Sequence, residues 1–131
     1  RVGYLVCEPG LAAAIRSVST PFGVNLPAQA AAAAALGEAE LARTAERSAT
    51  VAAERDRVVD ALRAQGWQVP DAQGNFFWLG VGDETAALAE HFRAAGILVR
   101  PFVGEGVRVS IGTTSDNERV LAAAAAWSAE H

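Results

Sequence analysis

Hydrophobic and polar residues alternate over short stretches in the second half of the chain, as in strands that bury one face. Glycine, proline and aspartate separate these stretches, so each strand is expected to end in a turn. The strands predicted in this way cover residues 67–69, 75–81, 97–103 and 107–111. The tight turn Gly104–Gly106 between the last two strands predicts an antiparallel hairpin.

Helical spacing of apolar residues dominates the segments between these strands. Residues 38–65 predict one long helix closed by Gly66, with an apolar stripe on one side and charged residues at exposed positions. The stripe comprises Leu41, Ala45, Ala52, Val59 and Leu62, and the exposed positions include Arg43, Arg47, Glu54, Arg55 and Arg57. A second helix is capped by Asp83 or Thr85 and stops at Gly96, and the capping box Ser115–Glu118 opens the last helix. The expected fold class is α/β, a small sandwich of antiparallel-containing sheet and helices.

The first 36 residues show a different pattern. Residues 2–7 form a β-branched and aromatic run that predicts a buried strand, followed by a helix up to Val18. Asn25 predicts the N-cap of a second, alanine-rich helix that ends at Gly37, with Pro27 in its first turn. This strand has no sheet partner in its own segment, so we expect it to complete a sheet in a region upstream.

Composition excludes several function classes. Of the 131 residues, 51% are hydrophobic and 20% charged, which is typical of a globular domain rather than a disordered chain. The net charge of −4 gives no general attraction to nucleic acid or an anionic membrane, and no apolar run is long enough to span a bilayer. Cys7 is the only cysteine, so no internal disulfide forms and a cytoplasmic setting is expected. With one cysteine and no paired histidines, no metal site can be argued.

The chain contains neither methionine nor lysine. Arg1 leads directly into the first strand-like run, so we expect the chain to be a segment of a longer protein. All 11 basic residues are arginine, and a guanidinium cannot act as the amine nucleophile of Schiff-base chemistry. The segment is therefore expected to contain no catalytic residue of this kind and to be inactive alone.

Arg108 is the first candidate for ligand binding. In residues 107–111 the side chains alternate, so the apolar ones face the helices and Arg108 faces the other side. A guanidinium on a rigid strand suits a carboxylate, although a solvated arginine or one paired with a surface acid fits the pattern too. Arg100 on the neighbouring strand suggests an anion pocket. Asn75 precedes a buried strand and could reach a ligand, although a turn asparagine is the default interpretation.

Several short motifs, in order along nearly the whole chain, resemble the fold-type-I pyridoxal-phosphate-dependent aminotransferases. The resemblance is to the branch that contains histidinol-phosphate and aromatic amino acid aminotransferases. The motifs are Arg1–Tyr4, Thr20–Asn25, Gly74–Phe77, Gly96–Pro101 and Gly106–Thr113.

This resemblance implies a role for each candidate. Arg1 would bind the cofactor phosphate, close after a Schiff-base lysine that lies upstream. Arg108 would grip the substrate α-carboxylate, and Arg100 would recognise the substrate side chain, with Asn75 as a further substrate-binding position. Asn25 would lie in a loop that approaches the active site of the partner subunit.

The resemblance also implies a domain organisation and a reaction. Residues 1–36 would close the large cofactor domain and residues 37–131 would form the small C-terminal domain of a homodimer. The reaction would be transamination between an amino acid and 2-oxoglutarate through pyridoxal 5′-phosphate. An aromatic amino acid is slightly favoured, and histidinol phosphate stays open because of Arg100. A decarboxylase of the same family is one alternative, and a non-catalytic module for amino acid binding or assembly is the other.

Overall fold

The computed structural model describes residues 2–130, and its contacts divide the chain into two compact units. The first unit ends at Glu46 and the second begins at Arg47. Both residues lie within one long helix, α3 (Glu38–Ala64). The domain boundary predicted between residues 36 and 37 stays a prediction.

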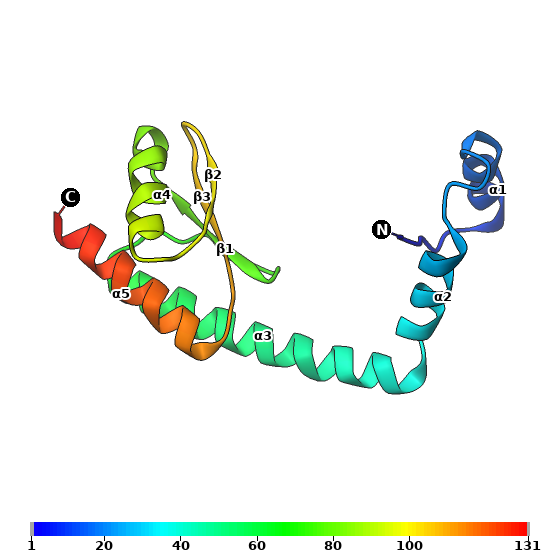
Figure 1. Ribbon diagram of the computed structural model, residues 1–131, viewed down its shortest axis with the longest axis horizontal. Helices are drawn as coiled ribbons and strands as arrows, with labels where there is room; N and C mark the ends of the chain where they lie inside the picture. The colour runs from blue at the N-terminus through cyan, green and yellow to red at the C-terminus, as the bar shows by residue number, and fades with distance from the viewer. Residues whose placement is uncertain (1, 131) are drawn as a thin grey trace. The chain divides into compact units, whose positions relative to one another are not determined.

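A three-stranded antiparallel sheet forms the framework of the second unit, as the sequence pattern predicts (Figure 1). Its strands are β1 (Phe76–Gly80), β2 (Arg100–Phe102) and β3 (Gly106–Ser110), and β3 pairs with both of the others. The turn between β2 and β3 contains Gly104 at φ +79°, a conformation that suits glycine. The predicted hairpin and fold class are confirmed.

Two of the predicted strands differ from the structure. Residues 67–69 form no strand, and the strand predicted over residues 97–103 is reduced to β2. Both segments follow a helix that ends in a Schellman-type turn at a glycine with positive φ. There the N–H of Trp67 donates to the carbonyl oxygen of Leu62 (3.1 Å), and the N–H of Ile97 to that of Phe92 (2.8 Å). Because these two N–H groups bond to the preceding helix, they cannot pair with a neighbouring strand.

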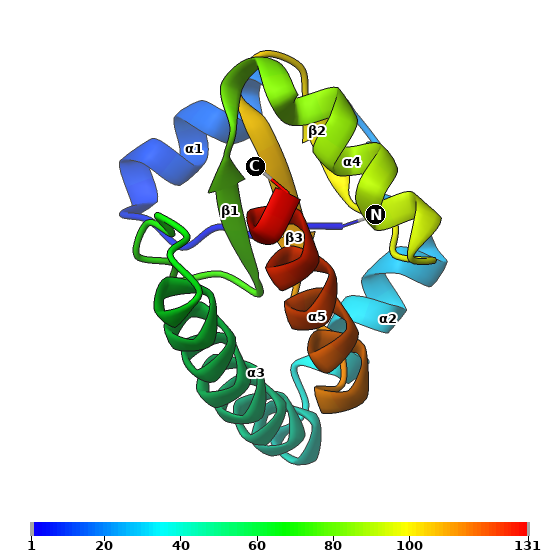
Figure 2. The same ribbon diagram turned by 90° about the vertical axis from the view of Figure 1, so that its left-hand side faces the viewer.

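Helices α3, α4 (Thr85–Ala94) and α5 (Thr114–Glu130) cover one face of the sheet (Figure 2). The alternation along β1 and β3 turns their apolar side chains toward these helices. The buried core comprises Val58, Val59, Leu62, Val69, Phe77, Leu79, Leu88, Phe92, Val107, Val109, Val120, Leu121, Ala123, Ala124 and Trp127. Helix packing therefore leaves the other face of the sheet, including Arg108, outside the core, as predicted.

The starts of α4 and α5 correct two predicted caps. The side chain of Thr113, not Ser115, caps α5: the N–H of Asp116 donates to Thr113 Oγ1 (3.2 Å), and Thr113 Oγ1 donates to Asp116 Oδ2 (2.6 Å). Helix α4 has no side-chain cap, because the 3₁₀ turn η1 (Gly82–Glu84) leads into it. The Thr85 hydroxyl donates back to the carbonyl oxygen of Gly82 (2.6 Å) and so fixes that turn.

One predicted exposed position on α3 is buried. Arg55 is only 8% exposed. Its guanidinium turns toward the loop before β1 and donates to the carbonyl oxygen of Gly74 (3.3 Å). Its charge is balanced by Asp56, whose Oδ1 lies 2.7 Å from Arg55 Nη2. Arg55 thereby ties α3 to the loop that precedes β1.

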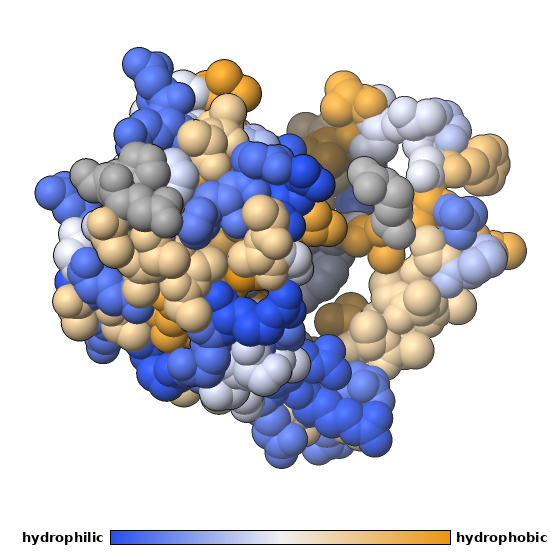
Figure 3. Space-filling model, turned by 60° about the vertical axis from the view of Figure 1, so that its left-hand side comes forward, coloured by the Kyte–Doolittle hydropathy of each residue, from blue (hydrophilic) through white to orange (hydrophobic). Residues whose placement is uncertain are grey.

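The first unit contains α1 (Pro9–Val18) and α2 (Leu26–Ala35), close to the predicted helices. The strand predicted over residues 2–7 does not form, because no described strand lies beside it to share its backbone hydrogen bonds. Neither helix contains a buried residue, and Figure 3 shows hydrophobic, orange atoms at the surface of this part of the chain. None of the described helices is long and apolar enough to cross a membrane.

Candidate functional site

The face of the sheet that the helices leave open carries both candidate arginines of the second unit. Arg108 lies on the central strand, and its register partners are Trp78 on β1 and Arg100 on β2. Partners in an antiparallel ladder project from the same face, so these three side chains form one row across the sheet. Arg100 is exposed and Arg108 is half-buried. The structure thus places both arginines on neighbouring strands and on one face of the sheet, as the sequence predicts.

These two arginines lack the compensation that most arginines of the unit have. Arg55, Arg57, Arg63 and Arg93 pair with carboxylates, and Arg119 donates to the carbonyl oxygens of Ala95 and Gly96. Among the described residues, no carboxylate or carbonyl oxygen binds the guanidinium of Arg47, Arg100 or Arg108. The open face therefore carries two positive charges with no described counter-ion, which favours an incoming anion.

Each of the two guanidinium groups lies over an aromatic ring. Arg108 Cζ lies 5.3 Å from the ring centre of Phe76, toward the Ser110 end of β3. Arg100 Cζ lies 5.3 Å from the ring centre of Phe102, toward the opposite end. Both distances fall within the range of cation–π attraction, about 0.5–1 kcal/mol at exposed sites. The two arginines therefore share a row across the sheet, but their guanidinium groups extend in opposite directions along the strands.

A third aromatic side chain extends this open face. The ring centres of Trp78 and Phe102 lie 5.5 Å apart with an interplanar angle of 61°, an edge-to-face pair. Both residues are half-buried and Phe76 is 38% exposed. The face therefore offers aromatic surface next to positive charge. We call Phe76, Trp78, Arg100, Phe102 and Arg108 the arginine-aromatic face.

Asn75 lies at the same end of the sheet as the Arg108 guanidinium. Its carbonyl oxygen accepts a hydrogen bond from the N–H of Ile111 (2.9 Å), which extends the pairing of β1 and β3 by one step. The residue also borders a hollow of about 500 Å³, which is lined by Arg47, Ser48, Val51, Ala52, Arg55, Gln73, Gly74 and Asn75. Its side chain is exposed and makes no hydrogen bond to a described residue, so the structure leaves it open to a ligand.

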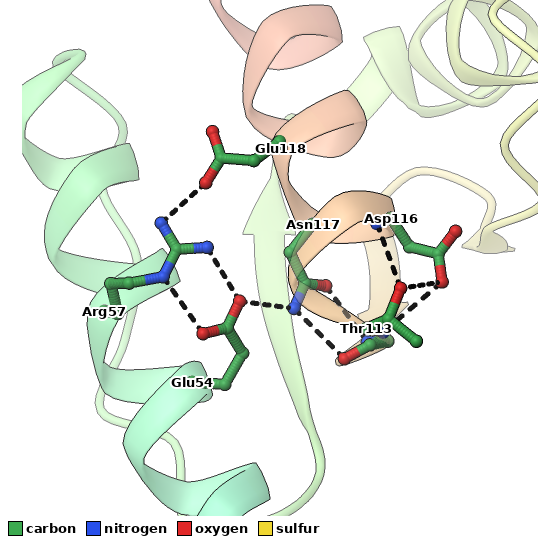
Figure 4. Close-up of polar contacts among 7 residues, drawn as sticks. Glu54, Arg57, Thr113, Asp116, Asn117 and Glu118 are labelled. Atoms are coloured by element: carbon green, nitrogen blue, oxygen red, sulfur yellow. Dashed lines mark hydrogen bonds and ion pairs between the residues drawn. The ribbon is translucent and has the colours of Figure 1, made fainter.

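A polar cluster around the buried Asn117, near the end of β3, was not anticipated from the sequence (Figure 4). Asn117 is 1% exposed, and its Nδ2 donates to Glu54 Oε1 (3.0 Å) and to the carbonyl oxygen of Gly112 (3.2 Å). Arg57 forks onto both oxygens of Glu54 (3.0 and 2.7 Å) and reaches Glu118 (2.8 Å). The spacing of Glu54 and Arg57, three residues apart on a helix, could have signalled their pairing. Nothing local in the sequence signals the contact with Asn117.

The cluster keeps Glu54 ionised. The hydrogen bonds from Arg57, and after them the one from Asn117, lower the pKa of the Glu54 carboxyl from 4.5 to about 2. The pKa of Arg57 is raised by its hydrogen bonds to Glu54. Hydrogen bonds from Thr113 lower the pKa of Asp116 at the start of α5. Glu54 therefore acts only as a hydrogen-bond acceptor near neutral pH.

The remaining candidates lie in the first unit. Asn25 is the N-cap of α2, as predicted, and its Oδ1 accepts from the N–H of Ala28 (2.9 Å). In the same loop Phe22 has φ +56°, an unusual conformation for a bulky residue, and its side chain is fully exposed. Arg1, predicted to bind the cofactor phosphate, lies outside the described residues.

Comparisons with known proteins agree with the sequence motifs. The family described as aminotransferase class I and II matches residues 1–124. Aromatic amino acid aminotransferases of Streptomyces coelicolor and Thermobifida fusca are 48% and 50% identical to this chain over 92% and 95% of its length. The chain spans about a third of each relative, 33% and 34%.

A crystal structure from Burkholderia pseudomallei K96243, provisionally assigned as an aminotransferase, is 32% identical with a TM-score of 0.74. The match covers 91% of this chain and 37% of that protein. The family match over residues 1–124 includes all five motifs found in the sequence. The chain belongs to the aminotransferase class I and II family.

Proposed function

We propose that the protein carrying this chain is a pyridoxal-phosphate-dependent aminotransferase acting on aromatic amino acids, with 2-oxoglutarate as the amino acceptor. In this proposal the arginine-aromatic face binds the amino acid, and Arg108 binds its α-carboxylate. The observation that carries the proposal is the row of Arg108 and Arg100 on an open sheet face, with no described carboxylate to neutralise either. The names of the two curated relatives support the reaction class.

The geometry around Arg108 suits a carboxylate. The guanidinium is planar and offers a fork of N–H donors that matches two carboxylate oxygens, an interaction worth about 1.5–3 kcal/mol. Its stacking on Phe76 restricts its rotation, so less conformational entropy is lost when the carboxylate binds. A bound anion would also balance part of the positive charge of this face.

The side chain of the substrate would lie over the aromatic part of the face. Trp78 and Phe102 offer ring edges and faces within one row of Arg108, which favours an aromatic ring as neighbour. Arg100 lies beside Phe102 and would equally suit a phosphate. Histidinol phosphate is therefore the alternative substrate, and Asn75 is a further position for a substrate contact.

The described residues fit the amino acid better than the cofactor. They contain arginine donors for a carboxylate and no lysine that could hold pyridoxal phosphate covalently. When bound, the cofactor supplies the electron sink for the reaction at the α-carbon. This part of the protein would orient the amino acid, and Arg1 would bind the cofactor phosphate. A decarboxylase could use the same arginines, so formation of glutamate from 2-oxoglutarate separates the two reactions.

The domain organisation completes the proposal. Residues 1–36 would close the large cofactor domain, and residues 37–131 would form the small domain. The loop around Asn25 would approach the active site of the partner subunit in a homodimer; the exposed Phe22 in this loop supports such a contact. The protein would act in the cytoplasm, where a single cysteine stays reduced.

The test is Arg108→Ala in the full-length protein that carries this chain. We expect KM for phenylalanine to rise roughly 10- to 150-fold, which corresponds to a loss of about 1.5–3 kcal/mol, while bound cofactor is retained. Arg93→Ala is the matched control, because Arg93 is exposed on α4 and pairs with Glu90. An unchanged KM for Arg108→Ala would refute the assignment. Faster turnover of histidinol phosphate than of phenylalanine would instead identify the alternative substrate.

A further inference from the structure

Strand β3 loses one of its neighbours just after Arg108. The pairing with β2 ends at Arg100, opposite Arg108. Beyond that point a hollow of about 270 Å³ lies beside the strand, bordered by residues that include Val109, Ser110, Gly112 and Asn117. On its other side β3 keeps β1 as a partner. The segment that follows Arg108 thus has half the backbone partners of a central strand.

The side chain of Asn117 compensates for the missing strand at Gly112. The N–H of Gly112 donates to Asn117 Oδ1 (3.0 Å), and Asn117 Nδ2 donates to the carbonyl oxygen of Gly112 (3.2 Å). This is the exchange of two hydrogen bonds that paired residues make in an antiparallel ladder. These two hydrogen bonds fix the backbone at Gly112, two residues after Ser110. Ser110 is the register partner of Phe76, whose ring lies under the Arg108 guanidinium.

Glu54 determines which way the Asn117 amide faces. A carboxylate only accepts hydrogen bonds, so Glu54 Oε1, 3.0 Å away, requires the amide nitrogen on its side. Glu54 is in turn held by the fork of Arg57, as Figure 4 shows. Helix α3 thereby controls the orientation of a side chain on α5 that holds the end of β3.

We propose that Asn117 is a positioning residue for substrate binding, which acts through Gly112 and β3 to hold Arg108 in place. The inference rests on the proposed role of Arg108. Asn117 touches neither the substrate nor the arginine-aromatic face, so its effect is on the placement of the guanidinium. A misplacement of about 1 Å far from the chemistry is enough to reduce activity strongly.

The test uses the full-length protein with phenylalanine and 2-oxoglutarate as substrates. In Asn117→Asp a second carboxylate faces Glu54 and no donor remains for the Gly112 carbonyl oxygen. We expect KM for phenylalanine to rise about tenfold with kcat changed less than about threefold, because binding rather than the chemical step is affected. In the double variant E54Q/N117D the new amide can donate to the new carboxylate, so KM should fall back to about three times the wild-type value.

The matched control is Glu118→Gln. Glu118 is the next residue on α5 and belongs to the same cluster, but it contacts Arg57 and not Gly112, so KM should stay unchanged. A lower melting temperature with unchanged KM for Asn117→Asp would overturn the proposal, as would a double variant with no recovery of KM. If Asn117→Asp fails to fold, Glu54→Gln alone should raise KM about threefold, and an unchanged value would overturn it.

Arg108→Ala in the same assay separates the two proposals. If Arg108→Ala leaves KM unchanged, the proposed carboxylate site is wrong, and the positioning role falls with it. If Arg108→Ala raises KM and the Asn117 variant does not, only the positioning role is wrong.

Discussion

Gly106 is the glycine of the sheet at which substitution by alanine should destabilise the protein most. A Cβ at this residue would lie 2.2 Å from the carbonyl oxygen of Leu79 and 2.8 Å from Trp78 Cζ2. Even close C–H···O contacts have carbon–oxygen distances of about 3.3 Å, so β1 and β3 would have to separate by about 1 Å. Rotation of a side chain cannot relieve this clash, because the oxygen belongs to the backbone. Gly106→Ala should therefore break ladder hydrogen bonds as well as overpack the sheet.

The expected cost for Gly106→Ala is about 3 kcal/mol, from overpacking by 1–3 kcal/mol and about 1 kcal/mol for a lost hydrogen bond. Gly104→Ala in the same turn is the control. Gly104 has φ +79° but nothing within 4 Å of its Cβ position, so only the backbone conformation is penalised, by about 1–2 kcal/mol. Urea unfolding followed by circular dichroism measures both. Equal losses in the two variants would refute the steric argument.

The other predictions concern α3 and α5. Because the folded-state pKa of Glu54 is about 2 and its ordinary value is 4.5, its contribution to stability is present above pH 4.5 and is lost as pH falls toward 2. The difference in unfolding free energy between wild type and Glu54→Gln should therefore be constant above about pH 5.5 and decrease as pH falls toward 2. A constant difference down to pH 2 would contradict it. Thr113→Ala should destabilise the protein by about 1 kcal/mol through loss of the α5 cap, whereas Ser115→Ala should change the unfolding free energy by less than about 0.5 kcal/mol. Chemical denaturation distinguishes these outcomes, and equal losses would contradict the assigned cap.

The sheet was predictable because its strands bury one face. Alternation around Phe77 and Leu79, and around Val107 and Val109, gives two strands whose observed bounds lie within one residue of the predicted ones. The same alternation predicts which face carries Arg108. Family motifs were needed to assign this arginine a function, since exposure alone does not distinguish a binding group from a solvated one.

The start of α5 shows where local pattern fails. Thr113 with Asp116, and Ser115 with Glu118, both match a capping box, and the sequence offers no means of choosing between them. In the structure Glu118 binds Arg57 of α3 instead. Thr113 and Asp116 form the cap at the start of α5. The choice depends on a contact between residues far apart in the sequence, which propensity does not contain.

In the second unit, the partners of an arginine depend on whether it lies on a helix or on a strand. This difference links the fold to the proposed site. On helices, carboxylates three residues away neutralise Arg57 and Arg93. On strands the neighbours come from other strands, and Arg108 meets Trp78 and Arg100. A slip of β3 by one residue would turn the Arg108 guanidinium into the core and expose the valines on either side of it. The core valines therefore hold Arg108 on the open face, where no described residue neutralises its charge and where the proposed function requires it to meet a carboxylate.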